Sequence, residues 1–158
     1  MSDLGIVVPF QSYDADVWSG RPIDFDAYRY AIKAFGLNKL RVINTSVLSL
    51  PGKETFDQGL DFGVYNTYAE FFSDNTAGPF TCFEMLGSIP AGQVGIPLHE
   101  LRHQTTGWYV FGPTGGMRAG DVPDATWAYI PAAPNLSFHT THAAAMVLWD
   151  WYRASLVV

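Results

Sequence analysis

The chain is 158 residues long, and its composition excludes several classes of protein before any motif is considered. Hydrophobic residues make up 48% and aromatic residues 15%, which is ample material for one packed domain of this length. No apolar run approaches the roughly 20 residues that a membrane-spanning helix needs. The formal net charge of −6 disfavours a general binder of nucleic acid, because such binding depends on basic side chains, and we expect no DNA partner.

Cysteine usage and the start of the chain predict a reducing, cytoplasmic setting. The single Cys82 cannot form an internal disulfide. The opening residues MSDLGIVVPF lack a basic segment followed by a long apolar one, so nothing indicates secretion, and no membrane partner is expected. A local basic patch at Lys33, Lys39 and Arg41 remains an alternative to the acidic average.

The first 44 residues predict a strand, a helix and a second strand. Residues 4–10 are β-branched and apolar, which favours a buried strand. Apolar residues recur at intervals of three and four over residues 24–35, which predicts a helix that Gly36 ends. Residues 40–44 predict the second strand. This order is typical of a parallel βαβ unit.

The remainder of the chain continues the alternation, although residues 45–78 have a weak pattern. A turn at 48–52 and a short helix at 68–72 are expected there. Ser137 is a suitable cap for a final helix that reaches Trp151. The other predicted elements are strands at 80–86, 108–111 and 126–130 and a short helix at 98–103. Together these elements predict one α/β domain over residues 1–158, with a parallel sheet flanked by helices.

Three segments in the last third of the chain resemble, in this order, motifs of the SPOUT superfamily of methyltransferases, and especially of its SpoU-like branch. They are FGPTGGM at 111–117, YIPAAP at 129–134 and SFHTTHAAAMVLWDW at 137–151. A looser similarity covers AFGLNKLRVIN at 34–44, which resembles the family's first helix and second strand.

The resemblance implies a parallel α/β sheet with a C-terminal trefoil knot, S-adenosylmethionine bound in the knot loops, and methylation of RNA on a ribose 2′-hydroxyl. It also implies a homodimer. The C-terminal helix would form the interface, since its apolar residues exceed one stripe: Ala143, Ala144, Met146, Val147, Leu148, Trp149 and Trp151. The residues that would contact the cofactor are Glu84, Met85, Gly87, Phe111, Gly112, Pro113, Thr114, Gly115, Gly116, Ile130, Pro131, Thr140 and Thr141.

Glycines are the chemically informative part of this set. A glycine loop at a strand end lets the backbone approach a ligand closely and presents free amide and carbonyl groups, which suits adenine and ribose. Gly112, Gly115 and Gly116 fit that task. The alternative is that GPTGG forms only a tight turn.

The chain departs from the family pattern at the residues expected to catalyse methyl transfer. Spacing places Asp24 where the family has Asn, Tyr30 where it has Arg, Thr114 where it has Glu, and His139 where it has a second Asn. Arg29 lies next to Tyr30 and is a further candidate.

Transfer to a hydroxyl needs a group that accepts the proton, and His139 is predicted to do so, with His142 as an alternative, because imidazole titrates near neutral pH. Each histidine can equally serve a structural role by hydrogen bonding backbone. The departures also leave open a noncatalytic SPOUT-like protein that binds the cofactor or a protein partner.

A competing signal is HELRH at 99–103, which matches the HExxH pattern of zinc peptidases. On a helix His99 and His103 would lie one turn apart, and Glu100 would activate water. Glycine and proline confine such a helix to about two turns. We therefore expect a solvated turn here and no metal, with a zinc-dependent hydrolase as the third interpretation.

Overall fold

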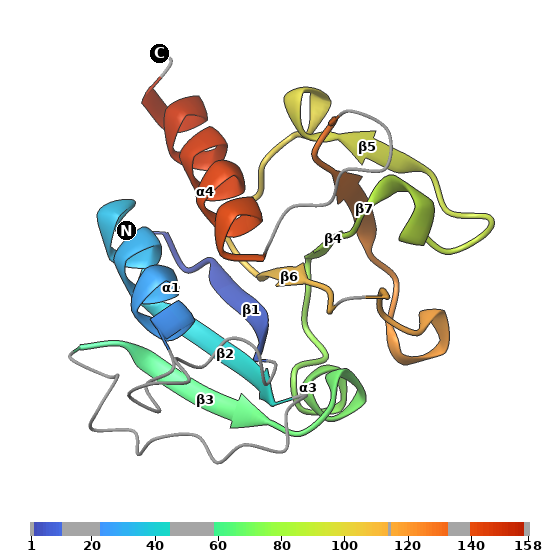
Figure 1. The fold of residues 1–158 in the computed structure, drawn as a ribbon, viewed down its shortest axis with the longest axis horizontal. Coiled ribbons are helices and arrows are strands. Elements are labelled where there is room, and N and C mark those ends of the chain that lie inside the picture. Colours follow the sequence, from blue (N-terminus) through green and yellow to red (C-terminus); the bar gives the residue numbers. More distant parts are fainter. Residues whose placement is uncertain (1, 11–22, 45–58, 114, 133–139, 157–158) are drawn as a thin grey trace.

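A computed structural model describes residues 2–10, 23–44, 59–113, 115–132 and 140–156. Its described part contains a seven-stranded, fully parallel sheet with strand order β3-β2-β1-β6-β4-β7-β5 (Figure 1). The strands are β1 (Gly5–Phe10), β2 (Lys39–Asn44), β3 (Asp61–Tyr65), β4 (Phe80–Phe83), β5 (Gly95–Pro97), β6 (Trp108–Phe111) and β7 (Thr126–Tyr129).

Helices cover both faces of the sheet, as a parallel sheet requires. The α-helices are α1 (Ile23–Ala34), α3 (Tyr68–Asp74) and α4 (Thr140–Leu156), and short 3-10 turns occur at η2 (Leu86–Ser88), η3 (Leu98–Glu100) and η4 (Ala119–Asp121). Helices α1 and α4 lie side by side on one face, and α3 packs on the other (Figure 1).

The two faces bury two hydrophobic cores, which alternate along each strand as the pleat dictates. In β6, Tyr109 and Phe111 join the core beneath α1 and α4, whereas Trp108 and Val110 join the core beneath α3. All six residues of β1 are buried, as fits a strand that lies inside the sheet between β2 and β6. The apolar residues of the chain therefore bury both faces of this sheet.

The predicted βαβ unit is confirmed. Strands β1 and β2 pair in parallel, and α1 connects them. Gly36 ends this helix as predicted: its φ is +79°, and Leu37 N–H donates to Ile32 O over 3.0 Å. A left-handed residue at this position is the usual way for a helix to stop, and glycine adopts it without steric strain.

Several predicted boundaries were wrong. The strand expected at 80–86 ends at Phe83, and η2 follows it. The helix expected at 98–103 is only the single 3-10 turn η3, because Leu98 and Leu101 both pack on the core and one tight turn places them there. Strands β3 and β5 were not predicted, since each lies at an edge of the sheet, contains glycine and has no fully buried residue.

The remaining predictions are met in part or lie outside the described residues. The helix at 68–72 is α3, which runs two residues further, and the final helix continues to Leu156. The turn at 48–52 and the cap at Ser137 lie outside the described residues, and the trefoil knot stays a prediction. No described helix is long and apolar enough to cross a bilayer.

Candidate functional site

The candidate site lies where β6, β4 and β7 end side by side. Because parallel strands point the same way, the three loops that follow them leave from one edge of the sheet, where ligands bind in open α/β folds. Backbone hydrogen bonds hold these loops in register. Gly112 N–H donates to Phe83 O over 3.2 Å, and Glu84 N–H donates to Ala128 O over 3.1 Å. The ends of three strands that are far apart in the sequence thus meet at Phe83 and Glu84.

The loop after β6 is shaped by its glycines. Gly115 and Gly116 have φ values of +90° and +89°, and Gly116 N–H donates to Pro113 O over 2.9 Å, which closes a turn. A side chain at Gly115 would meet open space, whereas one at Gly116 would crowd Ser88 and Glu84. The segment therefore forms a tight turn, as one interpretation predicted, and also leaves the backbone at Gly115 accessible, as the cofactor loop requires. Thr114 lies outside the described residues.

Glu84 places a carboxylate against this glycine loop. A Cβ atom added to Gly112 would lie 1.5 Å from Glu84 Oε1, so the carboxylate occupies the space that a side chain at 112 would need. Met117 N–H donates to the same Oε1 over 3.2 Å. The absence of a side chain at Gly112 thus admits the carboxylate between the end of β4 and the loop.

Burial changes the acid chemistry of Glu84. Desolvation raises the pKa of its carboxyl to about 7, although the hydrogen bond from Met117 N–H favours the ionised form. The neighbouring hydroxyl of Tyr68 donates to Phe111 O over 2.7 Å, and burial raises the Tyr68 pKa well above its ordinary value. Burial also raises the pKa of Cys82 on β4. Glu84 is therefore the member of this group that changes charge near neutral pH.

The other predicted cofactor residues surround this point to different degrees. Met85 and Gly87 are exposed in the loop after β4. Ile130 and Pro131 follow β7, the strand next to β4, with Ile130 half-buried against the core and Pro131 exposed. Thr140 and Thr141 form the first turn of α4 and are half-buried.

The predicted catalytic residues are more dispersed. Arg29 and Tyr30 lie on α1, with the Arg29 guanidinium 5.3 Å from the centre of the Tyr30 ring. Tyr30 is 67% exposed and so faces solvent rather than the core. His139 lies outside the described residues, immediately before α4. The catalytic roles of all three stay predictions.

The HELRH segment lacks the geometry of a zinc site. His99 and Glu100 are exposed in η3, whereas the His103 side chain is only 8% exposed. His103 Nδ1 lies 2.5 Å from the Tyr109 hydroxyl, and its Nε2 lies 2.8 Å from Asp150 Oδ2, so both ring nitrogens are engaged. Among the described residues, no group of three His, Cys, Asp or Glu side chains is suited to hold a metal ion.

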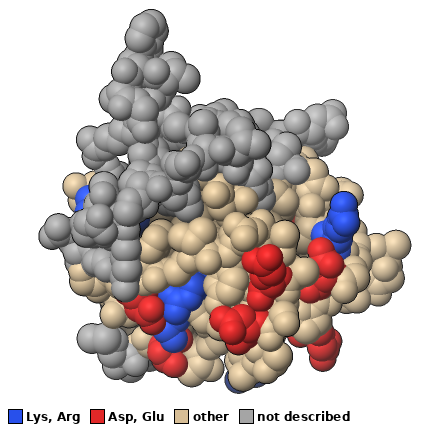
Figure 2. Space-filling model, turned by 90° about the horizontal axis from the view of Figure 1, so that it is seen from below, with Lys and Arg blue, Asp and Glu red and all other residues tan. Residues whose placement is uncertain are grey.

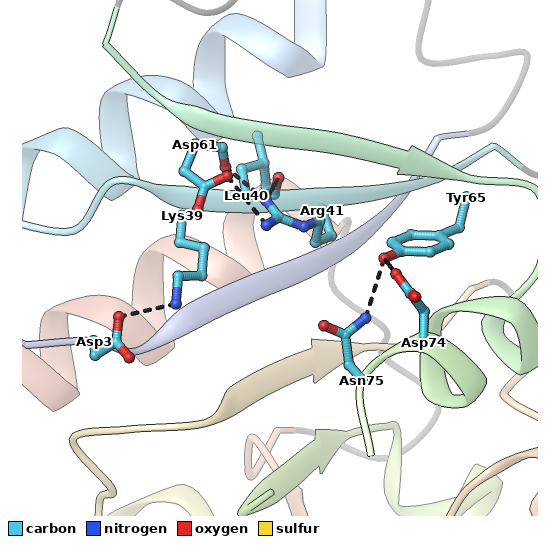
Figure 3. Close-up of polar contacts among 8 residues, drawn as sticks. All are labelled: Asp3, Lys39, Leu40, Arg41, Asp61, Tyr65, Asp74 and Asn75. Carbon is cyan, nitrogen blue, oxygen red and sulfur yellow. Dashed lines mark hydrogen bonds and ion pairs between the residues drawn. The ribbon is translucent and has the colours of Figure 1, made fainter. Parts of the chain in front are cut away.

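Two members of the suggested basic patch are paired with acids. Lys39 Nζ lies 2.9 Å from Asp3 Oδ1, and Arg41 Nη2 lies 3.1 Å from Asp61 Oδ1 (Figure 3). Both cations also lie 5.4 Å from the Trp108 ring. On the face seen in Figure 2, the basic and acidic side chains of the described residues are interspersed. This arrangement gives the described surface no strong phosphate-binding field there.

Sequence reasoning missed two features that the structure makes plain. Glu84 was expected only as one residue of a cofactor loop, although a lone acid after the apolar run FTCF and a glycine after the next strand were visible signals. The pairing of His103 with Asp150 spans 47 positions and gave no local signal.

Comparison with known proteins gives a likeness in structure alone. No protein-family model matches the sequence, and no curated protein matches it. A structure described as a probable methylase family protein from Haemophilus influenzae Rd KW20 superposes with a TM-score of 0.71 at 16% identity, over 99% of this chain and 66% of that one.

Two other structures agree with it. One describes the 2-OH methylation of C/U34 on tRNA, with a TM-score of 0.65 at 15% identity over 98% of this chain and 97% of that one. The other is an AdoMet-bound rRNA methyltransferase from Sinorhizobium meliloti, with a TM-score of 0.66 at 12% identity over 100% of this chain and 59% of that one. The chain thus spans about two thirds of the first structure and nearly all of the tRNA-related one. The chain shares the fold of these structures, which confirms the predicted α/β fold with a parallel sheet flanked by helices.

Proposed function

We propose that this chain is an S-adenosylmethionine-dependent methyltransferase that acts on RNA, with a ribose 2′-hydroxyl as the acceptor. The observation that carries the proposal is the meeting of three loops at the carboxyl ends of β6, β4 and β7, with a glycine-rich backbone at their centre. The fold shared with an AdoMet-bound methyltransferase and with a structure concerned with tRNA 2-OH methylation supports it.

The residues at this edge fit a nucleoside cofactor. Gly115 leaves open space beside its backbone, and Gly112 is approached so closely that any side chain would collide with Glu84. The backbone of residues 84–87, 111–116 and 130–131 and the first turn of α4 would hold the cofactor. When bound, S-adenosylmethionine supplies an electrophilic methyl group on a positively charged sulfur.

We assign the acceptor's proton to His139, which precedes α4. A neutral imidazole accepts a proton near pH 7. Arg29 and Tyr30 on α1 would orient the RNA. His142 in the first turn of α4 is exposed and is the alternative acceptor, so a variant at each histidine distinguishes the two.

The test is transfer of a labelled methyl group from S-adenosylmethionine to RNA, followed by digestion to nucleosides. We expect a 2′-O-methylated nucleoside, a rate lower by roughly 100-fold or more in His139→Ala, and a much smaller change in His142→Ala. Equal rates in parent and His139→Ala would reject His139 as the proton acceptor.

A noncatalytic protein is the second candidate, and the departures at Asp24, Tyr30, Thr114 and His139 favour it. It predicts cofactor binding by calorimetry with no transfer to any RNA tested. That outcome would replace the methyltransferase proposal.

We further propose that the chain forms a homodimer through α4 and Phe35, the residue that follows α1. Ala144, Val147, Leu148 and Trp151 of the predicted interface are buried in the chain's own core. Trp149, in contrast, is 50% exposed, and its ring lies 6.2 Å from Phe35 and 6.3 Å from Tyr152. The surface offered to a second copy is therefore this aromatic group rather than the whole helix.

A further inference from the structure

We propose that Glu84 is a specificity-determining residue of the cofactor site, whose carboxylate favours the cationic S-adenosylmethionine over the neutral product S-adenosylhomocysteine. The two molecules differ by the methyl group and the positive charge on sulfur. This inference rests on the proposed function and adds to it a means of product release.

The first support is position. Glu84 lies on β4's continuation between the loops that follow β6 and β7, and its main chain bonds to Ala128 O. Its Oε1 accepts from Met117 N–H, and its Oε2 lies 3.3 Å from where a Cβ of Gly116 would be. The carboxylate is therefore inside the loop cluster and not on its rim.

The second support is the lack of a compensating cation. Within the described ranges, no lysine, arginine or histidine forms an ion pair with Glu84. A carboxylate that is largely withdrawn from water and has one backbone donor is poorly compensated. A cationic ligand held at the adjoining loops would supply the missing charge, whereas a neutral ligand would not.

The third support is that the side chain is confined. Gly112 has no Cβ to displace the carboxylate, and Ser88 Cβ lies 3.2 Å from where a Cβ of Gly116 would be. Tyr68 from α3 and Cys82 from β4 are the titratable groups whose pKa values the Glu84 charge helps to raise, and burial, which raises these pKa values most, keeps both groups neutral at physiological pH. Among the described groups, Glu84 is therefore the one whose charge would act on a ligand bound here.

The test measures binding of S-adenosylmethionine and S-adenosylhomocysteine by calorimetry to the parent chain and to Glu84→Gln, at about pH 6 and about pH 8. Glutamine keeps the volume and the acceptor for Met117 N–H but removes the charge. One unit of charge a few ångströms away in a partly buried site changes a binding constant by roughly tenfold or more. Asp124→Asn, which removes an exposed charge elsewhere, is the control.

We expect the Kd of S-adenosylhomocysteine divided by the Kd of S-adenosylmethionine to fall about tenfold in Glu84→Gln at about pH 8, because the cation binds more weakly. The same ratio should stay unchanged in Asp124→Asn. In the parent the preference for S-adenosylmethionine should increase between about pH 6 and about pH 8, as Glu84 ionises. In Glu84→Gln this increase should be absent. If Glu84→Gln changes both dissociation constants by the same factor, Glu84 has a structural role, and this inference fails while the proposed function stands. If the parent binds neither ligand, the proposed function fails with it.

Discussion

Gly112 illustrates a use of glycine that recurs on the sheet face beneath α3. A Cβ at Gly112 would meet Glu84, one at Gly5 would lie 2.3 Å from the Trp108 ring, and one at Gly63 would lie 3.0 Å from Arg41 Cδ. In each pair the long side chain comes from the neighbouring strand or, for Glu84, from the residue directly after it, and lies across the glycine. Glycine is needed at these positions because a neighbouring side chain fills the space that a Cβ atom would occupy. Their φ angles do not require it.

At Glu84 this arrangement predicts a specific pH dependence of stability. The carboxyl has a folded-state pKa of about 7 against an ordinary value of 4.5, so the folded chain binds more protons than the unfolded chain between these values. Stability contributed by the neutral form is present below about pH 4.5 and is lost as pH rises through about 7.

Glu84→Gln removes this loss, so the variant should gain up to roughly 3 kcal/mol of unfolding free energy relative to the parent between about pH 4.5 and about pH 8. Urea unfolding at a series of pH values measures the difference, and Asp124→Asn serves as the control. A constant difference over this range would show that Glu84 is not desolvated.

At the scale of elements, α4 is tied to the segment before β6 by a chain of hydrogen bonds. Gln104 N–H donates to the Tyr109 hydroxyl over 3.3 Å, this hydroxyl contacts His103 Nδ1, and His103 Nε2 contacts Asp150. Trp151 Nε1 donates to Gln104 O over 2.9 Å. The later turns of α4 are thereby held near the start of β6, at the end of the strands opposite the candidate site.

Asp150→Asn should destabilise the chain by about 2 kcal/mol at pH 7, because it weakens charge-assisted hydrogen bonds to His103 and Arg153. Burial opposes ionisation of Asp150, but hydrogen bonds from Arg153 and His103 outweigh it and lower its pKa. This stability is present above the ordinary pKa of 3.8 and is lost as pH falls below it.

Urea unfolding at pH 7 and under acidic conditions measures the effect, with the exposed Asp124→Asn as the comparison. The gap between parent and Asp150→Asn should close in acid. A gap that persists there would assign the effect to helix packing and not to the charge.

How far sequence predicts these elements depends on whether the signal is local. Strands β1, β6 and β7 are largely apolar runs, β2 combines apolar with polar residues, and α1 has a regular stripe, so all five were predictable. Edge strands β3 and β5 are half-buried or exposed and lack such a run. The glycine loop and Glu84 were both predicted to contact the cofactor, but the position of the Glu84 carboxylate against that loop depends on pairing between strands and was not predicted.

For the whole molecule, the proposed homodimer predicts a concentration-dependent mass. Replacing Trp149 by Asp removes a half-exposed aromatic anchor and should weaken association by roughly 30-fold, since such residues contribute about 2 kcal/mol. Val94→Asp changes an 81% exposed apolar residue away from α4 and should leave association intact. Sedimentation over a range of concentrations compares them, and a parent chain that is monomeric at micromolar concentration would contradict the homodimer.

The central claim is that the glycine loop after β6 binds S-adenosylmethionine, and two glycines allow a matched test of it. Gly115 and Gly36 have φ values of +90° and +79°, and both face open space. Gly36 lies at the end of α1, away from the carboxyl ends of the strands. Valine at either position imposes a similar backbone strain, so the two variants differ mainly in their distance from the proposed site.

Calorimetric titration of S-adenosylmethionine into the parent, Gly115→Val and Gly36→Val is therefore the most direct measurement. We predict binding by the parent and by Gly36→Val, and affinity lower by roughly 100-fold or more in Gly115→Val, equal to about 2.7 kcal/mol, with both variants still folded by circular dichroism. Equal affinity in all three would remove the glycine loop from the site, and no binding by the folded parent would contradict the claim itself.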